Sequence, residues 1–221
     1  MLKAVIFDFD GVIQNFPELV WRERKVFLKD HKAQLEKSDL KILLGLTLSE
    51  QVIYINKKFR LTLTEDDFKK HRESIAGIIE KELKILEGIK ELIQTLKEKK
   101  IRMAIASNKP KAAIERDLKK FKLYFHFDLI LGKEDVTKPK PDPEIFFIAA
   151  KKLKVSPEEC IMIEDAIHGI KGAKKAGMKT IGLCSSFHSS FKEADLCIQS
   201  IKELSWKKLS SLCSKKYTKA I

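Results

Sequence analysis

Two pairs of acidic residues stand where apolar runs of the chain end. The first pair, Asp8 and Asp10, is separated by one residue, and the second, Glu164 and Asp165, is adjacent. A carboxylate that finishes a buried strand is poorly solvated unless a cation or hydrogen-bond donors accompany it. Either pair alone is also typical of an ordinary acidic turn. Together they have the residue types that metal binding and group transfer require.

Two further segments offer ligands for an anion. Ser107 and Asn108 follow another apolar run and precede Pro110, which suits the first turn of a helix. A hydroxyl, backbone N–H groups and a helix start favour a phosphate, although the same residues are common in plain turns and helix caps. Lys138 begins a proline-rich segment, either a rigid linker or a loop that holds the ammonium in place. A fixed cation is what a transferring phosphoryl group needs.

If the ligand is a phosphate monoester, its negative charge and that of the acids must be balanced by positive charge at these four segments. Asp8 would have to approach a dianion, and like unit charges about 4 Å apart repel by roughly 1 kcal/mol in water and by more at lower dielectric. A divalent cation between them removes this repulsion, and Lys138 assists. Mg²⁺ takes oxygen ligands, usually one or two carboxylates with water and phosphate. The residues therefore predict a magnesium site that includes Asp8 and Asp165.

These segments lie at the ends of predicted strands. Apolar runs typical of buried strands occur at residues 3–8, 101–106, 127–131, 160–164, 179–183 and 196–198. Helical patterns stand between most of them, at 88–100, 110–120, 144–153 and 166–176. Alternating strands and helices predict an α/β fold with a Rossmann-like, doubly wound parallel sheet. Ligands of such sheets bind beyond the carboxyl ends of the strands.

One long stretch breaks the alternation. Between the first and second runs the chain has helical patterns, with cap signals at Thr47 and Thr64, and no comparable central strand. We predict a helical cap at residues 16–83, inserted into an α/β catalytic core formed by residues 1–15 and 84–221.

Composition narrows the class of protein. The chain has 221 residues, of which 44% are hydrophobic and 34% charged, as is typical of globular proteins. A net charge of +13 suggests an anionic partner. Because the lysines are scattered and form no long block, they favour a solvated basic surface and a small phosphorylated metabolite over nucleic acid.

The chain offers no signal for export or for a membrane. No signal peptide is predicted, and no apolar stretch approaches the length of a membrane span. The four cysteines form no C-x-x-C pair and have no histidine at zinc-finger spacing. We therefore expect reduced cysteines, a cytoplasmic location, no membrane partner and a monomeric chain.

In their order along the chain, the four segments resemble the motifs of the haloacid dehalogenase superfamily. Motif I is similar to Asp8-Phe9-Asp10-Gly11-Val12, motif II to Ser107, motif III to Lys138 and motif IV to Glu164-Asp165. Asp-x-Asp alone is unspecific, whereas the ordered set with Lys-Pro-x-Pro-Asp is specific. The helical insert resembles the C1 cap of the superfamily, and the branch resembled most is that of beta-phosphoglucomutase and phosphoglycolate phosphatase.

The resemblance implies roles for the acidic residues. Asp8 would attack phosphorus and form an aspartyl-phosphate. Asp10 would protonate the leaving oxygen and then deprotonate the incoming water. Mg²⁺ would be held by the Asp8 carboxylate, the Asp10 main-chain carbonyl and Asp165, with Glu164 as a supporting or alternate acid.

The resemblance also implies how the phosphate is held. Ser107 and the Asn108 amide would bind it, and Lys138 would neutralise it. The activity that follows is a magnesium-dependent phosphatase acting on a small phosphate monoester, either a sugar phosphate or a phosphoglycolate-like molecule.

Two departures bear on the substrate. The sugar-phosphate mutases of this branch usually have Thr and His soon after motif I and an arginine in a Gly-x-Ser-Arg cap segment. Here residues 15–20 have neither Thr nor His, and the matching cap segment reads Gly45-Leu46-Thr47-Leu48. Both departures argue against a mutase. Ser107-Asn108-Lys109-Pro110 is instead similar to the Thr-Asn-Lys-Pro segment of phosphoglycolate phosphatases.

Two alternatives to the phosphatase stay open. A sugar phosphomutase would use the same core, and its product would be an isomerised sugar phosphate instead of inorganic phosphate. A nucleic-acid-binding protein on an inactive scaffold would account for the basic charge. Such a protein would have no use for Asp8, Asp10 and Asp165 together, and its binding would depend steeply on salt.

Overall fold

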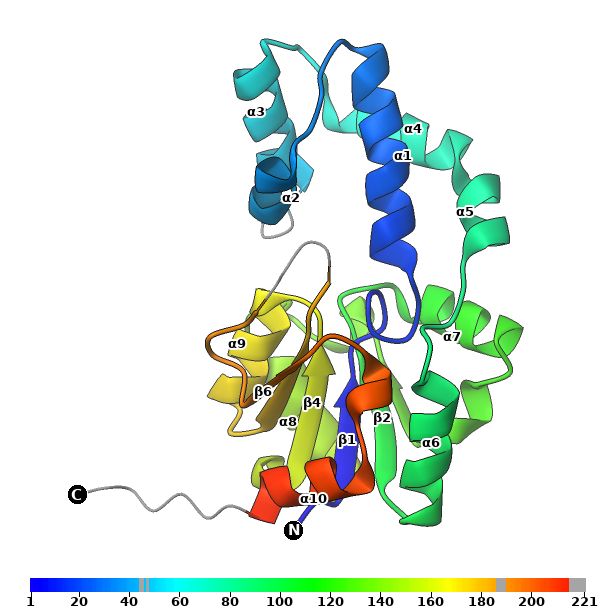
Figure 1. The fold of residues 1–221 in the computed structure, drawn as a ribbon, viewed down its shortest axis with the longest axis vertical. Helices are drawn as coiled ribbons and strands as arrows, with labels where there is room; N and C mark the ends of the chain where they lie inside the picture. The colour runs from blue at the N-terminus through cyan, green and yellow to red at the C-terminus, as the bar shows by residue number, and fades with distance from the viewer. Residues whose placement is uncertain (44–45, 47, 186–189, 215–221) are drawn as a thin grey trace, which may run out of the picture. The chain divides into compact units, whose positions relative to one another are not determined.

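The computed structural model describes residues 1–43, 46, 48–185 and 190–214 (Figure 1). The chain divides into two compact units, one formed by Met1–Ile13 with Ile85–Ile221 and the other by Gln14–Lys84. The insert expected from the sequence, residues 16–83, falls inside the second unit.

The first unit is built on a parallel sheet, which confirms the predicted α/β fold class. Its strands are β1 (Ala4–Phe7), β2 (Arg102–Ala106), β3 (Leu129–Leu131), β4 (Cys160–Glu164), β5 (Lys179–Leu183) and β6 (Leu196–Ile198). Their order in the sheet is β3-β2-β1-β4-β5-β6. The chain thus moves from β1 outward through β2 and β3 and then returns to the other side of β1, so the order reverses at β1.

Helices cover both faces of this sheet (Figure 1). They are α6 (Ile89–Glu98), α7 (Lys111–Lys120), α8 (Glu144–Lys152), α9 (Ile167–Lys175) and α10 (Trp206–Ser214). Val5 and Phe7 of β1 pack in an apolar cluster with residues of α6, α7 and α10. Ala4 and Ile6 pack in a second cluster with residues of α8 and α9. Alternate strand residues point to opposite faces, so this strand is apolar at every position.

The second unit is helical, and its described residues form no strand. It contains α1 (Phe16–Asp30), α2 (Lys37–Leu43), α3 (Leu48–Phe59), α4 (Glu65–Ser74) and α5 (Ala76–Glu82). Helix α4 starts where the sequence predicts, because the Thr64 hydroxyl accepts from the Asp67 N–H and the Asp67 carboxylate accepts from the Thr64 N–H. Thr47, the other predicted cap, and Gly45 of the segment compared with the mutases lie outside the described residues.

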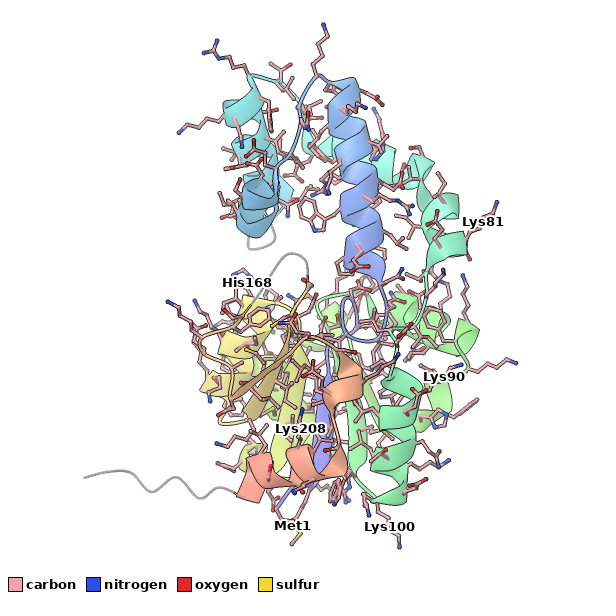
Figure 2. All side chains as sticks on the ribbon, in the orientation of Figure 1. Met1, Lys81, Lys90, Lys100, His168 and Lys208 are labelled. Carbon is pink, nitrogen blue, oxygen red and sulfur yellow. The ribbon has the colours of Figure 1, made fainter. Side chains whose placement is uncertain are left out.

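Basic side chains are spread over the surface. Figure 2 shows Lys81, Lys90 and Lys100 extending outward from the ribbon, and all three residues are exposed. This distribution agrees with a solvated surface more than with a single basic groove. None of the helices that the structure describes has the length and apolar composition needed to cross a bilayer.

Candidate active site

The predicted acids meet at the carboxyl ends of β1 and β4. These strands are neighbours in parallel register, with Phe7 opposite Ile163. The N–H of Asp8 donates to the carbonyl of Ile163 over 2.9 Å, which continues the ladder past the end of β1. Asp8 is thereby placed beside Glu164 at the point where the strand order reverses. Ligands of doubly wound sheets bind at such a point.

A buried lysine joins the two strand ends. Lys140 Nζ lies 2.8 Å from Asp8 Oδ1 and 2.9 Å from Glu164 Oε2. The lysine side chain is 4% exposed, and the side chains of Asp8 and Glu164 are 11% and 2% exposed. Burial by itself would lower the pKa of Lys140, but the charges of Asp8 and Glu164 raise it above its ordinary value. Lys140 is therefore a fixed cation.

The cation beside Asp8 is Lys140 and not Lys138, which corrects the sequence prediction. Lys138 is exposed. The backbone N–H groups of Thr137 and Lys138 both donate to the Glu144 carboxylate, at 3.0 and 2.8 Å. These bonds fix the outer part of the loop on the start of α8, and only after Pro139 does the chain turn its next lysine inward. The sequence prediction placed the fixed cation at Lys138, whereas the lysine that contacts Asp8 is two residues further along the same loop.

Glu164 takes part in the site directly. Its Oε1 accepts the backbone N–H groups of Asp165 and Ala166, each at 3.2 Å, just before α9 begins. A carboxylate at this end of a helix is favoured by the helix dipole. Its other oxygen is the one that contacts Lys140. The expected supporting acid therefore holds both the lysine and the turn after β4.

The three carboxylates form a cluster that fits a metal ion. One oxygen each from Asp8, Glu164 and Asp165 lies within 4.8 Å of the others. Burial raises the pKa of Glu164 to about 7, with the charge of Asp8 adding to the effect, and burial together with Glu164 raises that of Asp165. Burial is the larger cause of both pKa shifts, and the excess of three acids over one ammonium group adds to it. A divalent ion with oxygen ligands would supply the missing charge.

Two glycines provide the space for these carboxylates. A Cβ atom on Gly11 would lie 1.9 Å from Asp165 Oδ2, and one on Gly169 would lie 1.7 Å from Glu164 Oε2. Gly11 also has a φ of +89°, a conformation that residues with a Cβ rarely adopt. The glycine after Asp10 is therefore required both by the turn and by the neighbouring acid.

Replacing Gly11 with alanine is expected to lower activity at least about tenfold, because Asp165 must move and a displacement of roughly 1 Å in a reacting site can cost about 10²-fold. Gly177 is a matched control, since its φ is +88° and the nearest atom to an added Cβ is 3.8 Å away. Both variants should lose about 1–2 kcal/mol of stability, but only Gly11→Ala should lose turnover. Thermal melts and steady-state kinetics on the two variants check this, and equal activities would contradict it.

Ser107 and Asn108 lie at the end of β2 as predicted. Ser107 is 4% exposed, its N–H donates to the carbonyl of Leu131 over 3.1 Å, and its hydroxyl accepts from the Lys109 N–H over 3.4 Å. Asn108 is exposed, and its side-chain oxygen accepts from the backbone N–H of Lys140 over 3.2 Å. Asn108 thus ties the loop after β2 to the loop that carries Lys140. Phosphate binding by these two residues stays a prediction.

Asp10 makes a contact that the sequence did not predict. Lys109 Nζ lies 3.0 Å from Asp10 Oδ1 and 3.1 Å from Asp117 Oδ2. The side chain of Asp10 is not part of the cluster formed by Asp8, Glu164 and Asp165. Lys109 belongs to a segment singled out in the sequence for its likeness to phosphoglycolate phosphatases, but nothing in its local pattern pointed to an acid so far away along the chain.

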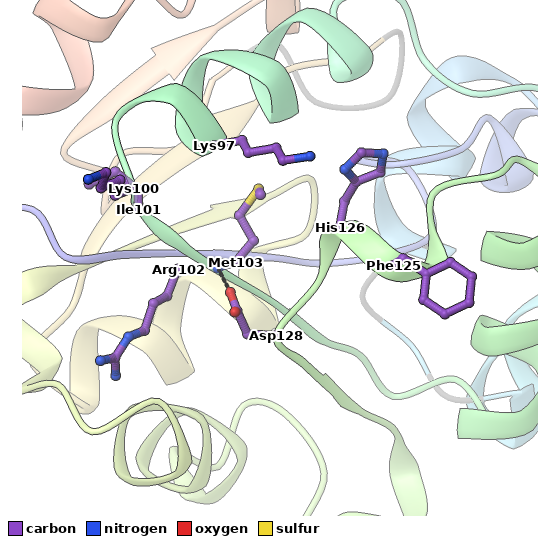
Figure 3. Close-up of a pocket in the computed structure, with 8 residues that line it drawn as sticks. All are labelled: Lys97, Lys100, Ile101, Arg102, Met103, Phe125, His126 and Asp128. Carbon is purple, nitrogen blue, oxygen red and sulfur yellow. Dashed lines mark hydrogen bonds between the residues drawn. The ribbon is translucent and has the colours of Figure 1, made fainter.

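A pocket lies away from these acids, at the amino-terminal end of β2 (Figure 3). Its volume is about 290 Å³, and Lys97, Arg102 and His126 are among its lining residues. The Asp128 carboxylate there accepts from the Met103 N–H over 2.8 Å. In Figure 3, Lys97 extends toward His126 whereas Arg102 extends away from both, so the basic side chains do not converge on one position. The pocket is separate from the site at the carboxyl ends of the strands.

Comparisons with known proteins agree with this geometry. The profile of the family described as "Haloacid dehalogenase-like hydrolase" matches residues 5–183. A phosphorylated carbohydrates phosphatase of Thermotoga maritima is 28% identical, over 81% of this chain and 84% of that protein. The beta-phosphoglucomutase of Bacillus subtilis is 31% identical, over 82% of this chain and 83% of the other. Among solved structures, a HAD hydrolase of family IA, variant 3, from Entamoeba histolytica is 27% identical with a TM-score of 0.77, covering 97% of this chain and 100% of that one.

Proposed function

We propose that this chain, which belongs to the haloacid dehalogenase-like hydrolase family, is a phosphatase that hydrolyses a small phosphate monoester through a phosphoryl group carried on Asp8. The observation that carries this proposal is the buried contact of Asp8 with Lys140 beside the acids that end β4. A lysine held 2.8 Å from Asp8 places one cation where the phosphate must arrive.

The first step transfers the phosphoryl group to the enzyme. Lys140 holds Oδ1 of Asp8, which leaves the other carboxylate oxygen to attack phosphorus. As the new bond between oxygen and phosphorus forms, the bond from phosphorus to the leaving oxygen breaks. Asp10 donates a proton to that oxygen, so that an alcohol departs instead of an alkoxide.

The second step returns the enzyme to its starting state. Asp10, now ionised, takes a proton from a water molecule as the water attacks phosphorus of the aspartyl-phosphate. The bond between phosphorus and Asp8 breaks, and inorganic phosphate leaves. Lys140 and Ser107 stabilise the charge on the phosphoryl oxygens in both steps, and Asn108 keeps the loop of Lys140 in place through its 3.2 Å hydrogen bond.

The acids beside Asp8 fit magnesium. Asp8 and Asp165, with the main-chain carbonyl of Asp10, would hold the ion, and Glu164 stands next to them. When bound, Mg²⁺ neutralises the phosphate and the carboxylate that attacks it. The fit rests on oxygen-only ligands, on the shortage of positive charge in the cluster and on the space that Gly11 leaves for Asp165.

A sugar phosphomutase is the second candidate. Its support is the 31% identity to the beta-phosphoglucomutase of Bacillus subtilis. The absence of Thr and His from residues 15–20 argues against it, because these are the residues that the mutases of this branch usually carry there. A mutase would return the phosphoryl group from Asp8 to a second hydroxyl of the sugar, whereas a phosphatase passes it to water.

Phosphate release from a panel of monoesters, with Mg²⁺ or with a chelator, tests the proposal. The panel contains phosphoglycolate, hexose phosphates and nucleotides, and sugar products are separated to detect isomers. We expect inorganic phosphate to form only with Mg²⁺. Isomerised sugar phosphate without phosphate release would establish the mutase. A folded protein that is inert toward every ester, with or without Mg²⁺, would contradict both candidates.

A further inference from the structure

Lys109 makes ionic contacts with two acids, one of which is Asp10, the proposed acid–base residue. Its ammonium lies between Asp10 Oδ1 at 3.0 Å and Asp117 Oδ2 at 3.1 Å. The three side chains are 12%, 22% and 3% exposed for Lys109, Asp10 and Asp117 respectively. Ion pairs at such sites are screened much less by solvent than those on an open surface. The contact therefore restrains the direction of the Asp10 carboxylate.

The lysine itself is held from several sides. It follows Asn108 in the loop after β2, and its Nζ lies 5.1 Å from the centre of the Phe9 ring, within range of a cation–π contact. Its backbone N–H donates to the Ser107 hydroxyl. The lysine is thus tied both to the loop after β2, which is predicted to bind phosphate, and to the segment that carries Asp8 and Asp10.

Asp117 anchors the lysine to helix α7. Its other oxygen accepts two hydrogen bonds from the Arg116 guanidinium, at 3.0 Å from Nε and 2.8 Å from Nη2. The Asp117 side chain is 3% exposed and that of Arg116 is 72% exposed, so burial on α7 limits the rotation of Asp117 more than the exposed arginine does. The chain of contacts runs from a helix, through Asp117 and Lys109, to one oxygen of Asp10.

We propose that Lys109 is a positioning residue, which aims the Asp10 carboxylate so that its second oxygen faces the leaving group and, later, the water. This inference rests on the proposed role of Asp10 in proton transfer. A carboxylate with free rotation would spend much of its time facing away, and general acid–base catalysis by a placed group is worth about 10²–10⁴-fold. If the role of Lys109 were purely structural, its contact would only join the loop after β2 to α7. Loss of the contact would then lower the activity toward every substrate alike.

The leaving group separates these two roles. Nitrophenolate departs from nitrophenyl phosphate without needing a proton, whereas the alkoxide of glycerol phosphate must be protonated as it leaves. The ratio kcat/KM reports on the step that phosphorylates Asp8, so it senses this difference. In Lys109→Ala, kcat/KM for glycerol phosphate should fall about 10²-fold and that for nitrophenyl phosphate by less than about threefold. Because water activation also needs Asp10, nitrophenolate should appear in a rapid burst followed by slow turnover.

Arg116→Ala is the matched control, since it removes a cation from the same Asp117 without touching Asp10. It should leave the ratio between the two substrates unchanged. Lys109→Arg, which keeps a cation able to reach both acids, should restore part of the loss. If Lys109→Ala does not fold, as judged by its thermal melt, Asp117→Asn replaces it, because it loosens the same anchor.

The outcomes are distinguishable. Equal losses for both substrates, or no loss, in a folded Lys109 or Asp117 variant would overturn the positioning role and leave the proposed function intact. A folded wild-type protein that releases no phosphate with Mg²⁺ from these two esters or from any ester of the panel above would overturn the proposed function, and the positioning role with it.

Discussion

Replacing Asp8 with asparagine should abolish phosphate release, with kcat reduced at least about 10³-fold, or roughly 4 kcal/mol of activation free energy. The amide has the same shape as the carboxylate but is neutral and does not form the phosphoryl intermediate. The variant should still fold, because Lys140 keeps its 2.9 Å contact with Glu164. Phosphate release under saturating substrate and Mg²⁺, together with a thermal melt, measures both properties.

A control for this variant comes from the helical unit. The Asp66 side chain is 65% exposed, and its ion pair with Lys70 lies on the surface. Asp66→Asn should therefore retain wild-type kinetics. Acid quenching during turnover, followed by mass spectrometry, should find the phosphoryl group on the peptide that contains Asp8 and should find none in the Asp8 variant. Normal turnover by Asp8→Asn would show that another residue is the nucleophile.

Replacing Lys140 with methionine should lower kcat by about 10²–10³-fold, since a preorganised cation at the reacting phosphate is lost. It should also lower the free energy of unfolding by about 3–5 kcal/mol, because two buried carboxylates lose their shared partner. Lys138→Met in the same loop is the matched control and should change neither property by much, given its exposed side chain.

The comparison of the two lysines decides between the sequence prediction and the structure. If Lys138→Met were inactive and Lys140→Met active, the contact of Lys140 with Asp8 would have no part in catalysis and the original assignment would stand. Lys140→Arg separates charge from shape. It keeps the cation and much of the stability, but its larger planar head should fit poorly between Asp8 and Glu164, so activity should be lower than in the wild type.

The sheet was predictable because its central strands, such as β1 and β4, are buried on both faces. Each strand is then a short run of apolar residues, visible without knowledge of any partner, as for Val5 to Phe7 or Ile161 to Ile163. The predicted capping box at Thr64 is equally local, since the two residues that exchange hydrogen bonds are three apart. Ends of strands are local features too, which is why Asp8, Ser107 and Glu164 were found from the sequence.

The chain by itself therefore determined the fold class, the chemical character of the site and the strand ends that supply it. Tertiary structure alone decided which lysine enters the site, because Lys140 is 132 residues from Asp8 and shares a loop with a second lysine of the same chemistry. It also decided that Lys109 contacts Asp10, 99 residues away. Such contacts depend on how loops from separate strands turn and on which buried charges need a partner, and neither leaves a periodic signal in the sequence.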